Sequence, residues 1–176
     1  MAMLARLGEG FFTGDSWLGG CEVVNATALP PCTAKLLVHQ DHMTAVLNAH
    51  CGQDVALQVL DHREEASLYC RKILLTVEGG RRIVEFGIVR MSLLVLPASA
   101  REEVVTRRFP LGAILVRYKV LTRVEPRWYL RFSAESPVVE YFAGAAKEAF
   151  GRLGVIHCNG QPAVELLEVV PEESAI

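Results

Sequence analysis

The chain has 176 residues, 51% of them hydrophobic and 22% charged, a balance that predicts one globular domain with a sizeable core. Its formal net charge of −2 gives no reason to expect a nucleic-acid partner, and no run of about 18 apolar residues predicts a membrane span. The five cysteines are scattered and form no CxxC pair, and the N-terminal residues lack the apolar stretch of a secretory signal. We therefore expect reduced thiols and a cytoplasmic protein.

The first part of the chain is glycine-rich and then becomes helical in character. Residues 1–33 are expected to form an irregular arm, and residues 34–176 the main domain. Over residues 33–50 apolar side chains recur at helical spacing in two pieces, and Asp41 is placed to cap the second piece. Residues 55–59 then alternate between apolar and more polar side chains, which predicts a strand with one buried face.

A charged connection over residues 61–65 leads to a segment rich in aromatic and branched side chains, residues 68–77, which predicts another strand. Because side chains alternate between the two faces of a strand, Arg71 is the only charged side chain on a face that is otherwise apolar. A buried guanidinium is costly unless an anion meets it. That anion is either a structural carboxylate, which the strand by itself favours, or part of a ligand.

The later segments predict hairpins joined by helices. We expect a partner strand over 83–91, short helices over 97–105 and 113–117, a long strand with one basic face over 116–132, a helix over 138–150, a closing hairpin over 153–158 and 163–170, and a frayed tail over 171–176. The long strand is either continuous or interrupted near Pro126. Because hairpins dominate and no strand-helix-strand repeat occurs, we predict an α+β fold with a single antiparallel sheet and helices packed on it.

Few motifs of known chemistry occur in the chain. His39, His42, His50 and Cys51 match no strong zinc-binding spacing, so we expect no metal site. The sequence has no GxGxxG, P-loop, HExxH or GxSxG motif, and we expect no cofactor. Two carboxylates near the C-terminus, Glu165 and Glu168, fall on opposite faces of the last strand. At most one of them therefore faces the layer of Arg71, and the spacing does not say which.

Several separate segments resemble, in order and at similar spacing, one enzyme family. They are Leu-Val-His-Gln-Asp-His-Met-Thr at 37–44, Tyr-Cys-Arg-Lys-Ile-Leu-Leu at 69–75, Pro-Leu-Gly at 110–112, Phe-Gly-Arg at 150–152, Gly-Gln-Pro at 160–162 and Leu-Glu-Val-Val-Pro at 167–171. This ordered set is similar to the chorismate pyruvate-lyases (4-hydroxybenzoate synthases) and covers about residues 36–171. The chain departs from that family at Phe86 and Arg90, where an arginine and a proline are common, and at His42, which replaces a serine. It resembles a divergent member.

The resemblance implies a fold of six antiparallel strands with the ligand buried under helical flaps. It also implies that Arg71 binds a substrate carboxylate and that Glu168 meets the ring hydroxyl, which makes these two the expected catalytic residues. Leu111, whose backbone N–H would meet the ring carboxylate, the adjacent Gly112 and the apolar Met43 complete the expected substrate-binding set.

The expected activity is release of pyruvate from chorismate to give 4-hydroxybenzoate, without metal or cofactor. Because the ring becomes aromatic, the enzyme has mainly to exclude water, hold one conformer and place charges. The alternative is a non-catalytic domain of the same fold that binds an aromatic or other carboxylate, as do the sensor domains of some bacterial winged-helix repressors. Either way the expected partner is a small-molecule carboxylate, and the oligomeric state is left open.

Overall fold

The computed structural model describes residues 2–14, 16–142, 144 and 146–172. These residues form one seven-stranded antiparallel sheet in the order β1-β5-β6-β7-β4-β3-β2. The strands are β1 (Cys21–Val24), β2 (Ala56–Glu65), β3 (Leu68–Val77), β4 (Arg82–Ser92), β5 (Thr122–Phe132), β6 (Ala149–Cys158) and β7 (Gln161–Pro171). The predicted α+β fold with a single antiparallel sheet is confirmed, with one strand more than the six expected.

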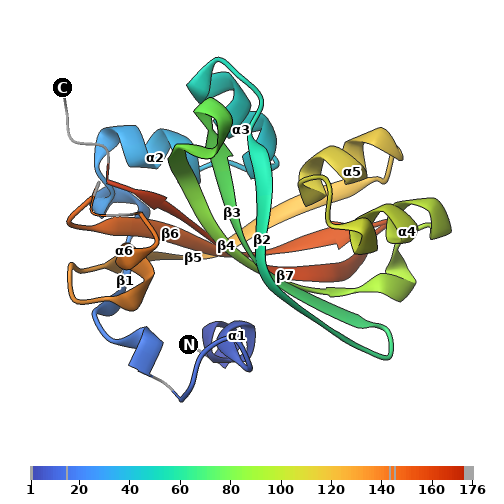
Figure 1. Ribbon diagram of the computed structural model, residues 1–176, viewed down its shortest axis with the longest axis horizontal. Coiled ribbons are helices and arrows are strands. Elements are labelled where there is room, and N and C mark those ends of the chain that lie inside the picture. Colours follow the sequence, from blue (N-terminus) through green and yellow to red (C-terminus); the bar gives the residue numbers. More distant parts are fainter. Residues whose placement is uncertain (1, 15, 143, 145, 173–176) are drawn as a thin grey trace.

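Helices cover both faces of this sheet. They are α1 (Ala2–Gly8), α2 (Pro31–Leu37), α3 (Met43–Cys51), α4 (Ala98–Thr106), α5 (Leu111–Arg117) and α6 (Pro137–Glu140). Figure 1 shows α1 on one side of the sheet, with α2 and α3 on the other side and α4 and α5 farther along the strands. The buried face of β3 that carries Arg71 therefore looks toward α2 to α5.

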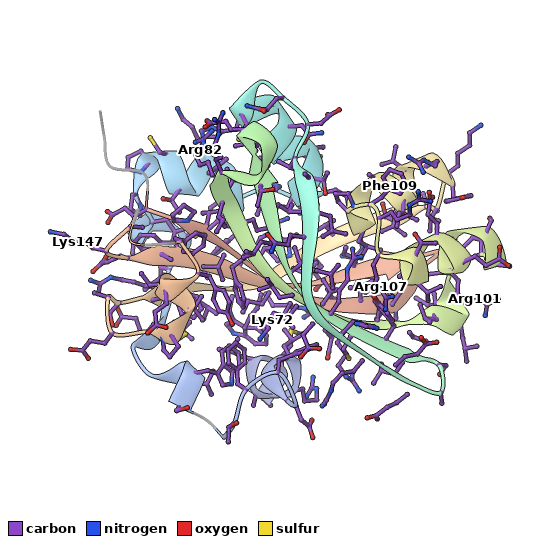
Figure 2. All side chains as sticks on the ribbon, in the orientation of Figure 1. Lys72, Arg82, Arg101, Arg107, Phe109 and Lys147 are labelled. Carbon is purple, nitrogen blue, oxygen red and sulfur yellow. The ribbon has the colours of Figure 1, made fainter. Side chains whose placement is uncertain are left out.

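Arg71 lies at the boundary between two apolar clusters on that face. Tyr69 belongs to a cluster under α4 and α5, whereas Ile73 belongs to a cluster under α2 and α3. The opposite face of β3 packs through Leu74 against α1 and its neighbours. Figure 2 shows Lys72, also on that opposite face, between the sheet and the N-terminal segment, where its Nζ lies 4.9 Å from the centroid of the Phe12 ring.

The two predicted hairpins are confirmed, and their turns explain why. Gly79 and Gly80 adopt φ angles of 67° and 90° between β3 and β4, a region that glycine enters without a steric penalty. Asn159 and Gly160, at φ angles of 52° and 82°, join β6 to β7 with the Asn-Gly pair that two-residue hairpin turns favour. These two turns set the register of the strands that they join.

Two predicted elements were wrong at their boundaries. The strand expected from residue 116 begins at Thr122, because α5 continues to Arg117 and the chain then turns through Lys119 at a φ of 52°. The helix expected over 138–150 is limited to α6, although residues 143 and 145 lie outside the described residues. Ala149 already pairs with Phe132 and Pro171 in the sheet, so pairing with two strands overrides the helical spacing.

Three smaller expectations also need correction. Residues 61–65 are not a connection but the end of β2, paired with β3. Asp41 is not the cap of α3: His42 occupies that position, without a side-chain cap. Residues 2–24 contain α1 and β1, more regular structure than expected of an irregular arm. The division at residue 33 stays a prediction, and the expected frayed tail falls mostly on residues 173–176, outside the described part of the chain.

Candidate functional site

A pocket lies between the Arg71 face of the sheet and the first turns of α3 and α5. All five residues that the resemblance assigns to a substrate line it: Met43, Arg71, Leu111, Gly112 and Glu168. The N-termini of the two helices meet closely above it, since a Cβ on Gly112 would lie 3.0 Å from the Cβ of His42. The tertiary structure thus brings together residues from four distant parts of the sequence, whose roles toward a ligand stay predictions.

Arg71 is buried in this pocket, with 2% of its surface exposed. Within the described part of the chain, its Nε and Nη1 have no hydrogen-bond acceptor, and no carboxylate lies within ion-pair distance. The structural ion pair that the strand by itself favoured is therefore wrong for these residues. Burial lowers the pKa of Arg71, and Tyr69 and Glu85 oppose that shift. Unsatisfied buried donors destabilise a fold, and an anion bound in the pocket would accept hydrogen bonds from this guanidinium.

Glu168 faces the pocket but already has a partner. The Nε of Arg152 on β6 donates to its Oε2 at 2.5 Å, between directly paired positions of β6 and β7. Glu165 is directed to the other side of the sheet, where it pairs with Arg6 of α1 and Arg90 of β4 at 2.6 and 3.3 Å. Of the two carboxylates, the one that the resemblance favoured is the one at the pocket.

Arg152 also fastens the connection between α2 and α3 to the sheet. Only 1% of its surface is exposed, and its remaining nitrogens donate to the carbonyl oxygens of Leu37, His39 and Asp41 at 3.3, 3.0 and 3.1 Å. A fully buried arginine is tolerated here because each of its three guanidinium nitrogens donates to an acceptor. Sequence reasoning missed this residue; the signal was a single arginine in the apolar run of β6.

His39 and His42 also hold the connection between α2 and α3 in place. His39 Nε2 donates to the Leu36 carbonyl at 2.6 Å, which leaves Nδ1 to accept from Arg152 and from the Asp41 amide. His42 Nε2 contacts the Thr122 hydroxyl at 2.9 Å, which links α3 to β5. Burial lowers the pKa of both imidazoles, and Arg152 lowers that of His39 further. Both are therefore accounted for by packing and hydrogen bonds. Among the described residues, no three metal-ligating side chains gather into a site.

Glu85 on β4 is the second pocket residue that sequence reasoning missed. It is 3% exposed, and its Oε2 has no partner among the described residues. Burial raises the pKa of Glu85 well above its usual range, and the neighbouring Glu168 raises it further, against the two arginines Arg71 and Arg152. The available signal was a single carboxylate within the apolar run of residues 83–89.

The pocket is small. Its cavity volume is about 50 Å³. One water needs about 10–15 Å³, so a few waters or a small polar molecule fit, whereas a cavity that holds benzene measures about 150 Å³. An aromatic ligand would therefore require the first turns of α3 or α5 to move away from the sheet.

Comparison with solved structures finds the same fold elsewhere. PhnF from Mycobacterium smegmatis matches over 77% of this chain and 65% of its own, at 10% identity and a TM-score of 0.54. Its effector domain, solved separately, matches over 75% of this chain and 89% of its own, with the same identity and TM-score. A third match is the ligand-binding domain of a Bordetella bronchiseptica protein described as a GntR-family transcriptional regulator. It matches over 69% of this chain and 92% of its own, at 9% identity and a TM-score of 0.50.

These likenesses establish the fold. At 9–10% identity they carry nothing further, and this chain spans only 65% of the full PhnF chain. No protein-family model and no curated protein matches the sequence. No helix in the described part of the chain has the length and apolar character to cross a membrane. The expectations about nucleic acid, cofactors and metal stay predictions.

Proposed function

We propose that this chain is a small-molecule binding domain that holds a carboxylate ligand against Arg71 without transforming it. The observation that carries the proposal is a buried guanidinium with two unsatisfied nitrogens in the wall of a pocket. A ligand carboxylate can accept from Nε and from an Nη of the same arginine in a bidentate arrangement, the strongest common form of such a contact.

The charge of the other pocket residues supports an anionic group at this place. Glu168 is neutralised by Arg152, and Glu85 holds its proton more tightly than an ordinary carboxyl group. The uncompensated charge in the pocket is then that of Arg71. Two of the similar structures are described as an effector domain and a ligand-binding domain, and this analogy at the level of the fold agrees with a binding role.

Chorismate pyruvate-lyase activity is the second candidate, and a specific observation favours it. Arg71, Leu111 and Glu168, the three polar contacts that the resemblance implies, line one pocket with Met43. Two observations weigh against it: the ion pair with Arg152 occupies Glu168, and the cavity is smaller than an aromatic ring requires. Incubation with chorismate and an assay for pyruvate decide between the candidates, and sustained pyruvate release would establish the lyase.

The binding proposal is tested by calorimetric titration with a panel of carboxylates that runs from acetate to 4-hydroxybenzoate and chorismate. Arg71→Ala is expected to weaken the best ligand by about 3 kcal/mol, or roughly a hundredfold in Kd, because the ligand carboxylate is left buried without its partner. Arg127→Ala is the matched control, since Arg127 is exposed on β5 and is expected to leave Kd unchanged. Equal affinity of wild type and Arg71→Ala would refute the proposal.

A further inference from the structure

Two buried ionisable groups, the guanidinium of Arg71 and the carboxyl group of Glu85, face the same pocket without pairing with each other. Arg71 has two unsatisfied nitrogens, and Glu85 has one unsatisfied oxygen, within the part of the chain that the structure describes. Both line the pocket, from neighbouring strands. An unsatisfied donor and an unsatisfied acceptor in one cavity call for a ligand that supplies both an acceptor and a donor.

The sheet keeps the two groups apart. In the β3–β4 ladder Arg71 pairs with Val89 and Glu85 pairs with Leu75, so the two residues are offset by four positions. At about 3.3 Å per residue, their Cα atoms are separated by about 13 Å along the strands. Both side chains line the pocket, and among the described residues no ion pair joins the guanidinium to the carboxyl group.

Gly87 keeps the floor of the pocket open. It lies on the same face of β4 as Glu85, opposite Ile73 on β3 and Glu168 on β7. A Cβ at this position would lie 3.1 Å from both Glu85 Oε1 and Ile73 Cδ1, closer than side chains normally approach. The absence of a side chain at Gly87 thus leaves room for the Glu85 carboxyl group and for what binds it.

The balance of charge indicates what kind of donor belongs beside Glu85. The charged groups around it are Arg71 from β3, Arg152 from β6 and Glu168 from β7, and His42 lines the same pocket from the start of α3. With Glu85 protonated, the two arginines and the Glu168 carboxylate leave one positive charge, which a ligand carboxylate offsets. A molecule with one acid and one ammonium group reaches the same neutral sum once Glu85 gives up its proton, and its ammonium group also supplies the donor that Glu85 Oε2 lacks.

We propose that the ligand is a small amino acid or similar zwitterion, with its carboxylate on Arg71 and its ammonium group on Glu85. This rests on the proposed binding function and specifies its ligand class. The cavity of about 50 Å³ agrees with the size, since at about 10–15 Å³ for each water it holds about three to five non-hydrogen atoms. Longer amino acids would be accommodated by displacement of the α3 or α5 turn.

The test compares pairs of ligands that differ only in the ammonium group. Glycine is titrated against acetate, 3-aminopropionate against propionate, 4-aminobutyrate against butyrate, and phenylalanine against 3-phenylpropionate. In at least one pair the amino compound is expected to bind the wild-type protein roughly tenfold or more tightly, because it satisfies Glu85 as well as Arg71. The series also measures which separation of the two charges fits best.

A second measurement on the wild-type protein reports on Glu85 directly. The same titrations are run in two buffers that differ in their enthalpy of ionisation. Binding of an amino compound is expected to transfer a proton from the Glu85 carboxyl group to the buffer, whereas the matched acid is expected to release none. This readout does not depend on a variant that folds.

The variants separate the two proposals. Glu85→Gln is expected to abolish the preference for the amino compound and to keep Arg71-dependent binding of the acid; Glu64→Gln, an exposed change on β2, is expected to keep the preference. If acids bind as tightly as their amino partners and still require Arg71, the zwitterion is wrong and carboxylate binding stands. If no member of either panel binds, both proposals are wrong.

Discussion

Arg71 occupies the middle of β3 between two apolar clusters, and two of its nitrogens find no acceptor among the described residues. Arg71→Met is therefore expected to leave the free energy of unfolding of the ligand-free protein unchanged or to raise it by about 1–2 kcal/mol, since an uncompensated buried charge is removed. Urea denaturation measures this. The control is Arg127→Met, expected to stay within about 0.5 kcal/mol. A loss of several kcal/mol at Arg71→Met would show that the arginine is structural.

Glu85 is expected to make the free energy of unfolding depend on pH. Its pKa in the folded protein lies above the ordinary value of 4.5, so between those two pKa values the folded state binds more protons and the free energy of unfolding falls as pH rises. Glu85→Gln removes this loss: the variant is expected to match wild type near pH 4 and to be more stable by about 1–3 kcal/mol at pH 8. Urea denaturation at pH 4, 6 and 8 measures it, with Glu64→Gln as the control. A destabilised variant at pH 8 would mean that Glu85 is ionised and paired.

At the scale of elements, Arg152 joins the sheet to the connection between α2 and α3. Arg152→Met is expected to lower the free energy of unfolding by about 3–5 kcal/mol, because the largely buried Glu168 loses its partner and three carbonyl groups lose a donor. Hydrogen exchange is expected to accelerate at the amides of residues 38–44 more than in β6.

The matched double variant separates charge from packing. Adding Glu168→Gln to Arg152→Met removes the unpaired carboxylate, so part of the lost stability is expected to return, as the coupling between contacting residues requires. If the double variant is as unstable as the sum of the two single variants, the ion pair contributes nothing specific. Glu168→Gln by itself is also expected to destabilise, because Arg152 then faces a neutral amide.

At the scale of the whole molecule, residues 2–14 and 16–24 contribute side chains to the core. Leu4, Leu7 and Trp17 are buried against the sheet face opposite the pocket, and β1 extends the sheet beside β5. Leu7→Ala is expected to cost about 2–5 kcal/mol of unfolding free energy. Leu94→Ala, at a residue that is 70% exposed, is the matched control and is expected to stay within about 0.5 kcal/mol. Equal, small effects in thermal and urea unfolding would mean that the segment is dispensable.

Local patterns in the sequence were sufficient for the elements whose pairing is local. The Gly79-Gly80 and Asn159-Gly160 turns predict their hairpins because those residues adopt the backbone angles that tight turns need. Alternation located β3 and singled out Arg71 on its buried face. The same reasoning failed at residues 138–150, where the apolar spacing is helical but Ala149 and Phe150 pair with strands on both sides.

The content of the site was decided by tertiary structure. Glu85, Arg152 and Glu168 come to Arg71 only because the sheet places β6, β7, β4 and β3 in adjacent order, and no local spacing encodes the register between strands so far apart in the chain. That register pairs Glu168 with Arg152 and leaves Arg71 and Glu85 without an ion-pair partner among the described residues. A single sequence shows that a buried arginine needs a partner, whereas which carboxylate reaches it depends on strand pairing, which only the tertiary structure decides.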